Sequence, residues 1–185
     1  GVYKTIDGGA TWTPLNEGVP SYREEYKGAT ALAVDVLHDN RPAGIIDGDY
    51  YVFGAGNTWS LVGEDVAITS DHSHLYFHPT DPNTIYSAGS VIKKSSDGGV
   101  EWDTVSSGSG PYRDLAFHLS APNALLAANQ LGWGGNTGGV RKSLNGGLNW
   151  IDASKGITAQ AIQGVAIDPQ NPSYLYAGLS AGSYS

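Results

Sequence analysis

Carboxylate side chains are the groups in this chain best suited to acid–base chemistry. Hydrolysis of a glycosidic bond uses two of them, about 5–10 Å apart, and the pKa of the one that acts as general acid is raised. No spacing or motif selects such a pair here, and most of the acidic residues are expected to be solvated loop charges. The carboxylates that remain candidates are Glu24, Glu25, Asp47, Asp49, Glu64, Asp65, Asp71 and Asp114.

Two short segments hold potential metal ligands. In "SDHSH", Asp71 precedes His72 and His74, and two histidines two residues apart on a strand would share a face. The spacing fixes no third ligand, so a zinc site is not favoured. The carboxylates of Asp47 and Asp49 are too few for calcium, which takes about six to eight oxygens. The sequence therefore predicts no metal site and no cofactor.

The overall charge argues against two classes of partner. Eighteen acidic and 10 basic residues give a formal net charge of −8, and the chain contains no cysteine. Nucleic acid and anionic membrane surfaces both favour clusters of lysine and arginine, so neither is expected as a partner. No apolar stretch approaches the roughly 18 residues of a membrane-spanning helix.

One short phrase recurs along the chain. "KTIDGGATW", "KSSDGGVEW" and "KSLNGGLNW" share a pattern that ends in tryptophan, and "VFGAGNTW" is a fourth copy with Gly54 where aspartate is expected. The tryptophans are 47, 43 and 48 residues apart. The repeated positions are Thr5, Asp7, Gly9 and Trp12; Gly56 and Trp59; Ser95, Asp97, Gly99 and Trp102; and Ser143, Asn145, Gly147 and Trp150.

The phrase is better suited to making a turn than to catalysis. The Asp97 carboxylate can accept backbone N–H bonds from the residues that follow it, and Asn145 can do the same without the charge. Gly98 and Gly99 allow the positive φ of a tight hairpin, after which the tryptophan packs between strands. The alternative, that Asp7 and Asp97 are acid–base residues, is disfavoured because turn formation occupies these side chains.

The segments between the copies predict four short strands per repeat. An alternating apolar segment opens each unit, as in "ALAVDV", "HLYFHP", "DLAFHL" and "GVAIDP". A second strand, a third strand, a Gly-Gly turn and a fourth strand carrying the tryptophan follow. Four antiparallel strands in about 46 residues are typical of a β-propeller blade, so the fold class is all-β. The expected repeats are residues 1–28 (half), 29–72, 73–112, 113–160 and 161–185 (half).

The ends of the chain fall within a blade. Residues Gly1–Thr5 match a third strand and Tyr174–Gly178 a second one, which gives three full blades and two halves. Either the two halves share one blade, or the chain is part of a larger propeller; the starting glycine and the lack of methionine favour the second. Open strand edges tend to be paired. We therefore expect missing blades, self-closure or another chain to cap them.

The phrase Ser/Thr-x-Asp-x-Gly-x-x-Trp resembles the Asp-box, or BNR repeat. It is similar to blades of sialidases, xyloglucan-active glycoside hydrolases, sortilin-type receptors and photosystem assembly factors. The "DPxxP…LYAG" phrase upstream is typical of the hydrolase and assembly-factor branch. The resemblance covers nearly the whole chain and implies Asp-boxes on the perimeter, away from the binding face. It does not specify an activity.

Ligand-binding groups are expected in the loops that vary while the frame repeats. "NQLGWGGNTGG" is an insertion between a second and a third strand, and its Trp133 could serve as a sugar-stacking platform or instead cover the edge of a blade. The connections between blades contribute Tyr22, Arg23, Tyr112 and Arg113 as further candidates.

These features favour a non-catalytic binding module that takes a glycan or a protein and belongs to a secreted or surface-borne protein, at an extracellular or cell-surface location. The alternative is part of a carbohydrate-active glycoside hydrolase. Its xyloglucan-active relatives place their two catalytic aspartates in separate propellers, so one piece of this length lacks the whole cleft. Sialidase chemistry is less favoured, since the Arg-Ile-Pro phrase of those relatives is missing here.

Overall fold

The computed structural model describes residues 1–19, 28–67, 73–106, 110–130, 138–157 and 161–179, and every named element in them is a β-strand. Three four-stranded antiparallel sheets are flanked by two two-stranded ones. The N-terminal half-blade is β1 (Tyr3–Lys4) and β2 (Thr13–Pro14), and the C-terminal half-blade is β15 (Ile162–Ile167) and β16 (Leu175–Leu179).

The three complete blades have their strands in simple sequence order. The first blade is β3 (Ala29–Asp35), β4 (Arg41–Ile46), β5 (Asp49–Gly54) and β6 (Thr58–Gly63). The second is β7 (His74–Phe77), β8 (Ile85–Ala88), β9 (Ile92–Ser95) and β10 (Asp103–Thr104). The third is β11 (Tyr112–His118), β12 (Ala121–Asn129), β13 (Gly139–Ser143) and β14 (Ile151–Asp152).

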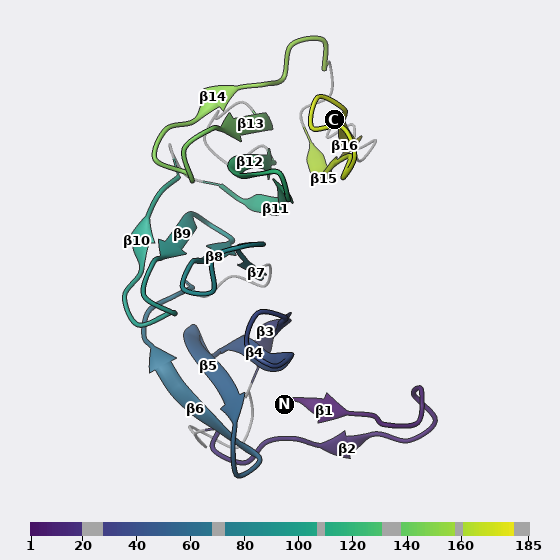
Figure 1. Cartoon of the computed structure of the whole chain (residues 1–185), viewed down its shortest axis with the longest axis vertical. Helices are drawn as coiled ribbons and strands as arrows, with labels where there is room; N and C mark the ends of the chain where they lie inside the picture. Colours follow the sequence, from purple (N-terminus) through teal and green to yellow (C-terminus); the bar gives the residue numbers. More distant parts are fainter. Residues whose placement is uncertain (20–27, 68–72, 107–109, 131–137, 158–160, 180–185) are drawn as a thin grey trace, which may run out of the picture.

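Successive blades follow one another along an open arc, with β6, β10 and β14 on its outer side and β3, β7 and β11 on its inner side (Figure 1). The two half-blades lie at opposite ends of this arc, in separate sheets. This arrangement confirms the predicted all-β blades. Within this structure the half-blades do not share a blade.

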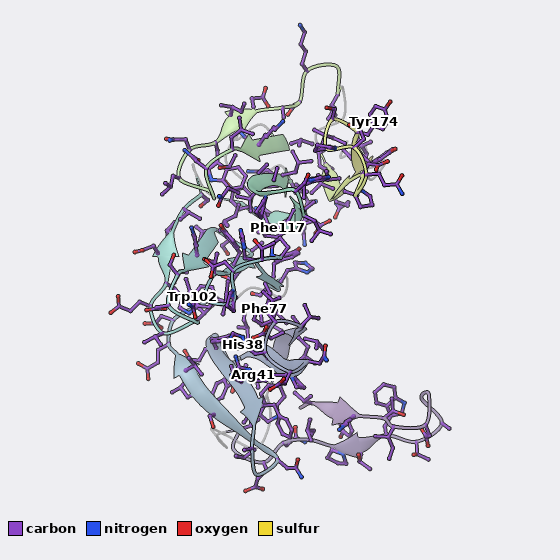
Figure 2. All side chains as sticks on the ribbon, viewed as in Figure 1. His38, Arg41, Phe77, Trp102, Phe117 and Tyr174 are labelled. Atoms are coloured by element: carbon purple, nitrogen blue, oxygen red, sulfur yellow. The ribbon has the colours of Figure 1, made fainter. Side chains whose placement is uncertain are left out.

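The hydrophobic core lies between neighbouring blades. Leu75 and Ile85 of the second blade pack on Ala43 and Ile45 of the first, and the same arrangement recurs between the second and third blades. Phe77 and Phe117 occupy these two contacts (Figure 2). Because successive strand residues face opposite neighbours, the period-2 pattern of the sequence places one apolar set on each side of a blade.

A residue at the end of each inner strand, or directly after it, caps the turn that follows. Asp35 and Asp168 accept backbone N–H bonds through a carboxylate, and His78 and His118 accept them through Nδ1. The two histidines therefore serve as strand-end hydrogen-bonding residues, as their repeat position predicts.

Two details differ from the sequence expectation. Trp12, Trp102 and Trp150 come immediately before the fourth strand of their blades, and only Trp59 lies within one. Tyr112 opens β11 although it was placed at the end of the preceding repeat. Both differences are shifts of one or two residues at strand ends, where the hydrogen-bond ladder begins.

Candidate binding surface at the loop end of the blades

Three copies of the repeated phrase fold into the same hairpin. In the second blade, Ser95 Oγ donates to Asp97 Oδ1 at 2.7 Å and accepts from Gly99 N–H at 2.8 Å. The Asp97 carboxylate also accepts the N–H groups of Val100 and Glu101 at 3.0 and 3.1 Å. The Asp97 carboxylate is therefore used to form the turn, as the sequence predicts.

The other copies repeat these contacts with different residue types. Thr5 and Asp7 make them in the N-terminal half-blade, and Ser143 and Asn145 make them in the third blade. The glycine pairs have matching positive φ values, for example 80° and 101° at Gly98 and Gly99. The fourth copy keeps only a turn through Gly56 before Trp59.

The hairpin bonds lower the pKa of both exposed aspartates. Hydrogen bonds from the Thr11 side chain and backbone, then from Thr5, hold the pKa of Asp7 well below its ordinary value. For Asp97 the Ser95 hydroxyl contributes most to a pKa shift in the same direction, followed by the Glu101 backbone. Each of these hydrogen bonds stabilises the charged carboxylate that accepts it.

Replacing Asp97 with asparagine tests this electrostatic role. The carboxylate has a folded pKa below its unfolded one, so the stability it contributes is present above about pH 3.8 and is lost as the pH falls through the folded value. Asparagine keeps an acceptor without the charge, as Asn145 does naturally. We expect the melting temperature of Asp97→Asn to fall less than that of the native protein between pH 5 and pH 2. Equal falls would contradict the assignment.

The hairpins lie at the end of the blades opposite the variable loops. In each antiparallel blade, the turn between third and fourth strands is at the same end as the turn between first and second strands. Hydrogen bonds join these two turns directly, from Gly98 N to Asn83 O and from Gly146 N to Asn123 O, both at 2.9 Å. We call this the box end. The connections between blades and those between second and third strands meet at the other end, the loop end.

Three of the repeated tryptophans also have a structural role. Trp59 and Trp150 donate from Nε1 to a backbone carbonyl of the preceding blade, Leu15 O at 2.8 Å and Val105 O at 2.7 Å. Trp102 bonds instead to Gly99 O and packs edge-on against Tyr50. Trp102 lies on the outer side of the arc (Figure 2). Trp59, Trp102 and Trp150 thus join successive blades along their perimeter.

On the inner strands, Asp114 is the candidate carboxylate with the most specific surroundings. Its Oδ1 accepts the Tyr76 hydroxyl at 2.8 Å, and its Oδ2 accepts Val165 N–H at 3.0 Å. Tyr76 in turn accepts Leu115 N–H. Burial, followed by the Asp114 charge, raises the pKa of Tyr76. Asp114 therefore links the first strands of three successive blades, β7, β11 and β15.

Removing this link should cost stability. Asp114→Ala leaves the Tyr76 hydroxyl and the Val165 amide without their acceptor, which we expect to lower the free energy of unfolding by about 2 kcal/mol. Asp114→Asn keeps one carbonyl acceptor and should lose less. Urea denaturation measures both. An alanine variant as stable as the native protein would contradict this role.

Arg113 and Tyr112 lie side by side in sequence but in different environments. A register shift in β11 falls between Tyr112 and Asp114, which makes Arg113 the bulged residue. Arg113 is half-buried at the loop end, and its Nε–H donates to Gln130 Oε1 at 2.5 Å. Tyr112 is buried in the core between the second and third blades. Its ring is therefore not displayed to a ligand, which corrects its place among the candidate contacts.

The loop end brings three blades together around Arg113. Gly110 N–H bonds to Ser90 O, Gln130 N–H bonds to Pro111 O, and Gln130 also forms a β-bridge with Ala161. We call these residues, with Arg113, the loop-end junction. The other ligand candidates, Tyr22, Arg23 and Trp133, lie outside the described residues, as do Glu24, Glu25, Asp71 and His72.

The remaining acidic candidates are at the loop end of the first blade. Asp47 accepts Gly28 N–H, and Asp49 accepts Asp65 N–H at 2.9 Å. Burial and then the charges of Asp49, Asp47 and Glu64 raise the pKa of Tyr51. Among the described residues no group of three or more acidic or histidine side chains is placed to hold a metal ion. His74 lies beside Tyr76, 6.3 Å between ring centres.

Sequence reasoning did not anticipate one ionic cluster. The buried Asp35 carboxylate lies 2.6 Å from His38 Nδ1 and 3.1 Å from an Arg41 Nη atom. It lies in the turn between β3 and β4, at the box end. The Asp-x-x-His-x-x-Arg spacing was the available signal, because a tight turn brings such residues together.

Comparisons with known proteins were made by family, by sequence and by structure. No protein-family model and no curated protein matches this chain. An ancestral GH74 enzyme superposes with a TM-score of 0.64 at 20% identity, over 90% of this chain and 23% of that one. The GH74 xyloglucanase from Xanthomonas campestris gives 0.62 at 21% identity, over 96% and 25%. YCF48 bound to D1 peptide gives 0.62 at 14% identity, over 96% and 53%.

These solved structures are β-propellers. The chain folds as β-propeller blades. It spans about half or less of the length of each propeller named above. At these identities the likeness establishes the propeller fold alone. No helix in the described part of the chain is long and apolar enough to cross a membrane.

Proposed function

We propose that the chain is a non-catalytic propeller module of a secreted or surface-borne protein, and that it binds a peptide segment of a protein partner at the loop-end junction. The observation that carries this proposal is that the aspartate side chains are already held by hydrogen bonds or ion pairs within the fold. Asp7 and Asp97 are held in hairpins, Asp35 in an ionic cluster, and Asp114 between three inner strands.

The electrostatics also disfavour hydrolysis. A general acid needs a carboxyl group whose pKa is raised towards the working pH. The carboxyl groups with clear shifts move the other way: hydrogen bonds lower the pKa of Asp7, Asp81, Asp97 and Asp152. These groups stay ionised and hydrogen-bonded at neutral pH, which suits a structural role.

The loop-end junction has groups that suit a peptide. The Arg113 guanidinium carries five N–H donors in a fixed plane, of which the Nε–H is used by Gln130. Backbone carbonyls and carboxylates of a peptide are acceptors for such donors. YCF48, a protein of similar fold, has been solved with a bound peptide, which favours this ligand class.

Binding is tested with an array of immobilised random dodecapeptides, with xyloglucan as a glycan probe. We expect the native chain to retain a subset of peptides and Arg113→Ala to weaken their binding about tenfold or more. Arg141→Ala is the matched control, since Arg141 lies on the third strand β13 of the same blade. Retention of xyloglucan but of no peptide would replace the protein partner with a glycan.

A second candidate is part of a carbohydrate-active hydrolase, favoured by the two GH74 enzymes among the similar structures. It is tested by incubating the chain with xyloglucan and measuring new reducing ends. We expect none above a heat-denatured control. Release that is abolished by Asp114→Asn would overturn the non-catalytic proposal.

A further inference from the structure

A surface groove lies at the junction of the first and second blades, on the outer side of the arc where β6 and Trp102 are seen (Figures 1 and 2). The first blade contributes Leu61 and Glu64, and the hairpin of the second blade contributes Val100 and Glu101. The volume of the groove is about 490 Å³. We call it the perimeter groove. It shares no residue with the loop-end junction.

Contacts between the two blades hold the perimeter groove in shape. Gly63 lets the end of β6 approach the hairpin closely, since a Cβ there would lie 2.1 Å from Gly99 O. Trp102 is held at two points, by the bond from Nε1 to Gly99 O at 2.8 Å and by the edge-on contact with Tyr50. A ligand that binds such a preformed groove costs the protein little conformational entropy.

Both blades expose apolar side chains in the perimeter groove. Leu61 is 47% exposed and Val100 is 57% exposed, although both are aliphatic. Trp102 is half-buried, so part of its ring remains accessible. An aliphatic side chain of a ligand would remove this apolar surface from water, which favours binding.

The charged side chains of the perimeter groove are mostly acidic. Glu64, Asp65 and Glu101 are exposed, and Lys93 is the one basic residue among the described residues that line the groove. The Lys93 ammonium already bonds to the backbone carbonyl of Asp65. Three carboxylates and one ammonium give the groove a formal charge of −2. A cationic ligand is therefore complementary to it.

The next junction holds a neutral counterpart of this groove. Between the second and third blades, a groove of about 350 Å³ has Leu148 at the repeat position of Val100 and Asn149 at that of Glu101. None of the described residues that line this second groove is charged. The propeller frame thus forms such a groove without carboxylates. The acidic side chains of the perimeter groove are an addition that the fold does not require.

From these observations we propose that the perimeter groove binds an arginine side chain of a protein partner, together with an aliphatic residue next to it in the same segment. The guanidinium stacks on the Trp102 ring and donates to the carboxylates of Glu64 and Glu101. The aliphatic neighbour covers the exposed apolar side chains. Arginine is favoured over lysine because its planar fork bonds carboxylates in pairs and stacks on aromatic rings.

A library of dodecapeptides with a fixed central Leu-Arg pair and randomised flanks tests this proposal. Retained peptides are labelled with fluorescein and titrated by fluorescence polarisation. Peptides that bind the Arg113→Ala variant as tightly as the native chain are carried forward, which separates this groove from the loop-end junction. We expect Glu101→Asn to weaken the binding of these peptides about fivefold. Citrulline, a neutral isostere of arginine, should weaken it at least as much when placed in the peptide.

The Glu101→Asn variant should fold as the native chain does. Asp97 accepts the backbone N–H of Glu101, which the substitution keeps, and Asn149 holds the same position in the hairpin of the third blade. Circular dichroism checks the fold.

A charge-matched variant separates the groove from the overall charge of the chain. Glu101→Asn combined with Asn149→Glu keeps the formal net charge of −8. The second groove has no other carboxylate among its described lining residues, so binding should stay weak in this double variant. A library that yields no peptide independent of Arg113, equal affinities for the native chain and Glu101→Asn, or recovery in the double variant would overturn the proposal.

Discussion

Replacing Trp59 with alanine is expected to lower the free energy of unfolding by about 3–5 kcal/mol, as is usual for a large buried aromatic side chain. Trp59 is buried between the N-terminal half-blade and the first blade, where it packs edge-on against Phe53 at 5.4 Å. Its indole N–H also bonds to Leu15 O at 2.8 Å. The alanine variant loses the packing and the bond that hold the half-blade in place.

Trp59→Phe separates these two contributions. Phenylalanine retains most of the buried ring area but cannot donate to Leu15 O, so a loss of about 1–2 kcal/mol is expected. Guanidinium denaturation followed by circular dichroism measures both variants. If Trp59→Ala were no less stable than Trp59→Phe, the tryptophan would not join the two blades as described.

Gly99→Ala should lower the free energy of unfolding by about 3 kcal/mol or more, because two costs add. The residue has φ of 101°, and a Cβ there would lie 2.3 Å from Cε1 of the fully buried Tyr50. Left-handed backbone costs a residue with a Cβ about 1–2 kcal/mol, and overpacking adds about 1–3 kcal/mol. Thermal and urea denaturation give the measurement.

Gly98→Ala is the matched control in the same hairpin. Its φ is 80°, but the nearest atom to an added Cβ is Asn83 Oδ1 at 3.9 Å. Only the backbone cost applies, so a loss of about 1–2 kcal/mol is expected. Equal losses for the two variants would show that the contact between the hairpin and the first blade does not matter for stability.

The frame of the fold was predictable because it depends on local patterns that repeat. The spacing of Trp12, Trp59, Trp102 and Trp150 set the blade length, and alternating apolar residues set the strands. The turn chemistry of Asp97 was also readable, because its partners lie within four residues. Interactions this local are encoded in the spacing of a few side chains.

The parts of the candidate surface that were missed depend on contacts between blades. Tyr76 and Asp114 are 38 residues apart and meet only because β7 and β11 are neighbouring inner strands. The burial of Tyr112 depends on the bulge at Arg113, which turns adjacent side chains into different environments. No spacing in the sequence indicates that Tyr76 contacts Asp114 or that β11 has a bulge at Arg113.

The central claim is that the repeated phrase forms hairpins at the box end, while binding takes place at the loop end. Hydrogen–deuterium exchange of the native chain, with and without a peptide selected from the array, tests it most directly. The account predicts new protection at residues 89–90, 110–113, 130 and 161, with exchange at the hairpins of residues 95–101 and 143–149 unchanged. Protection confined to the hairpins would contradict it.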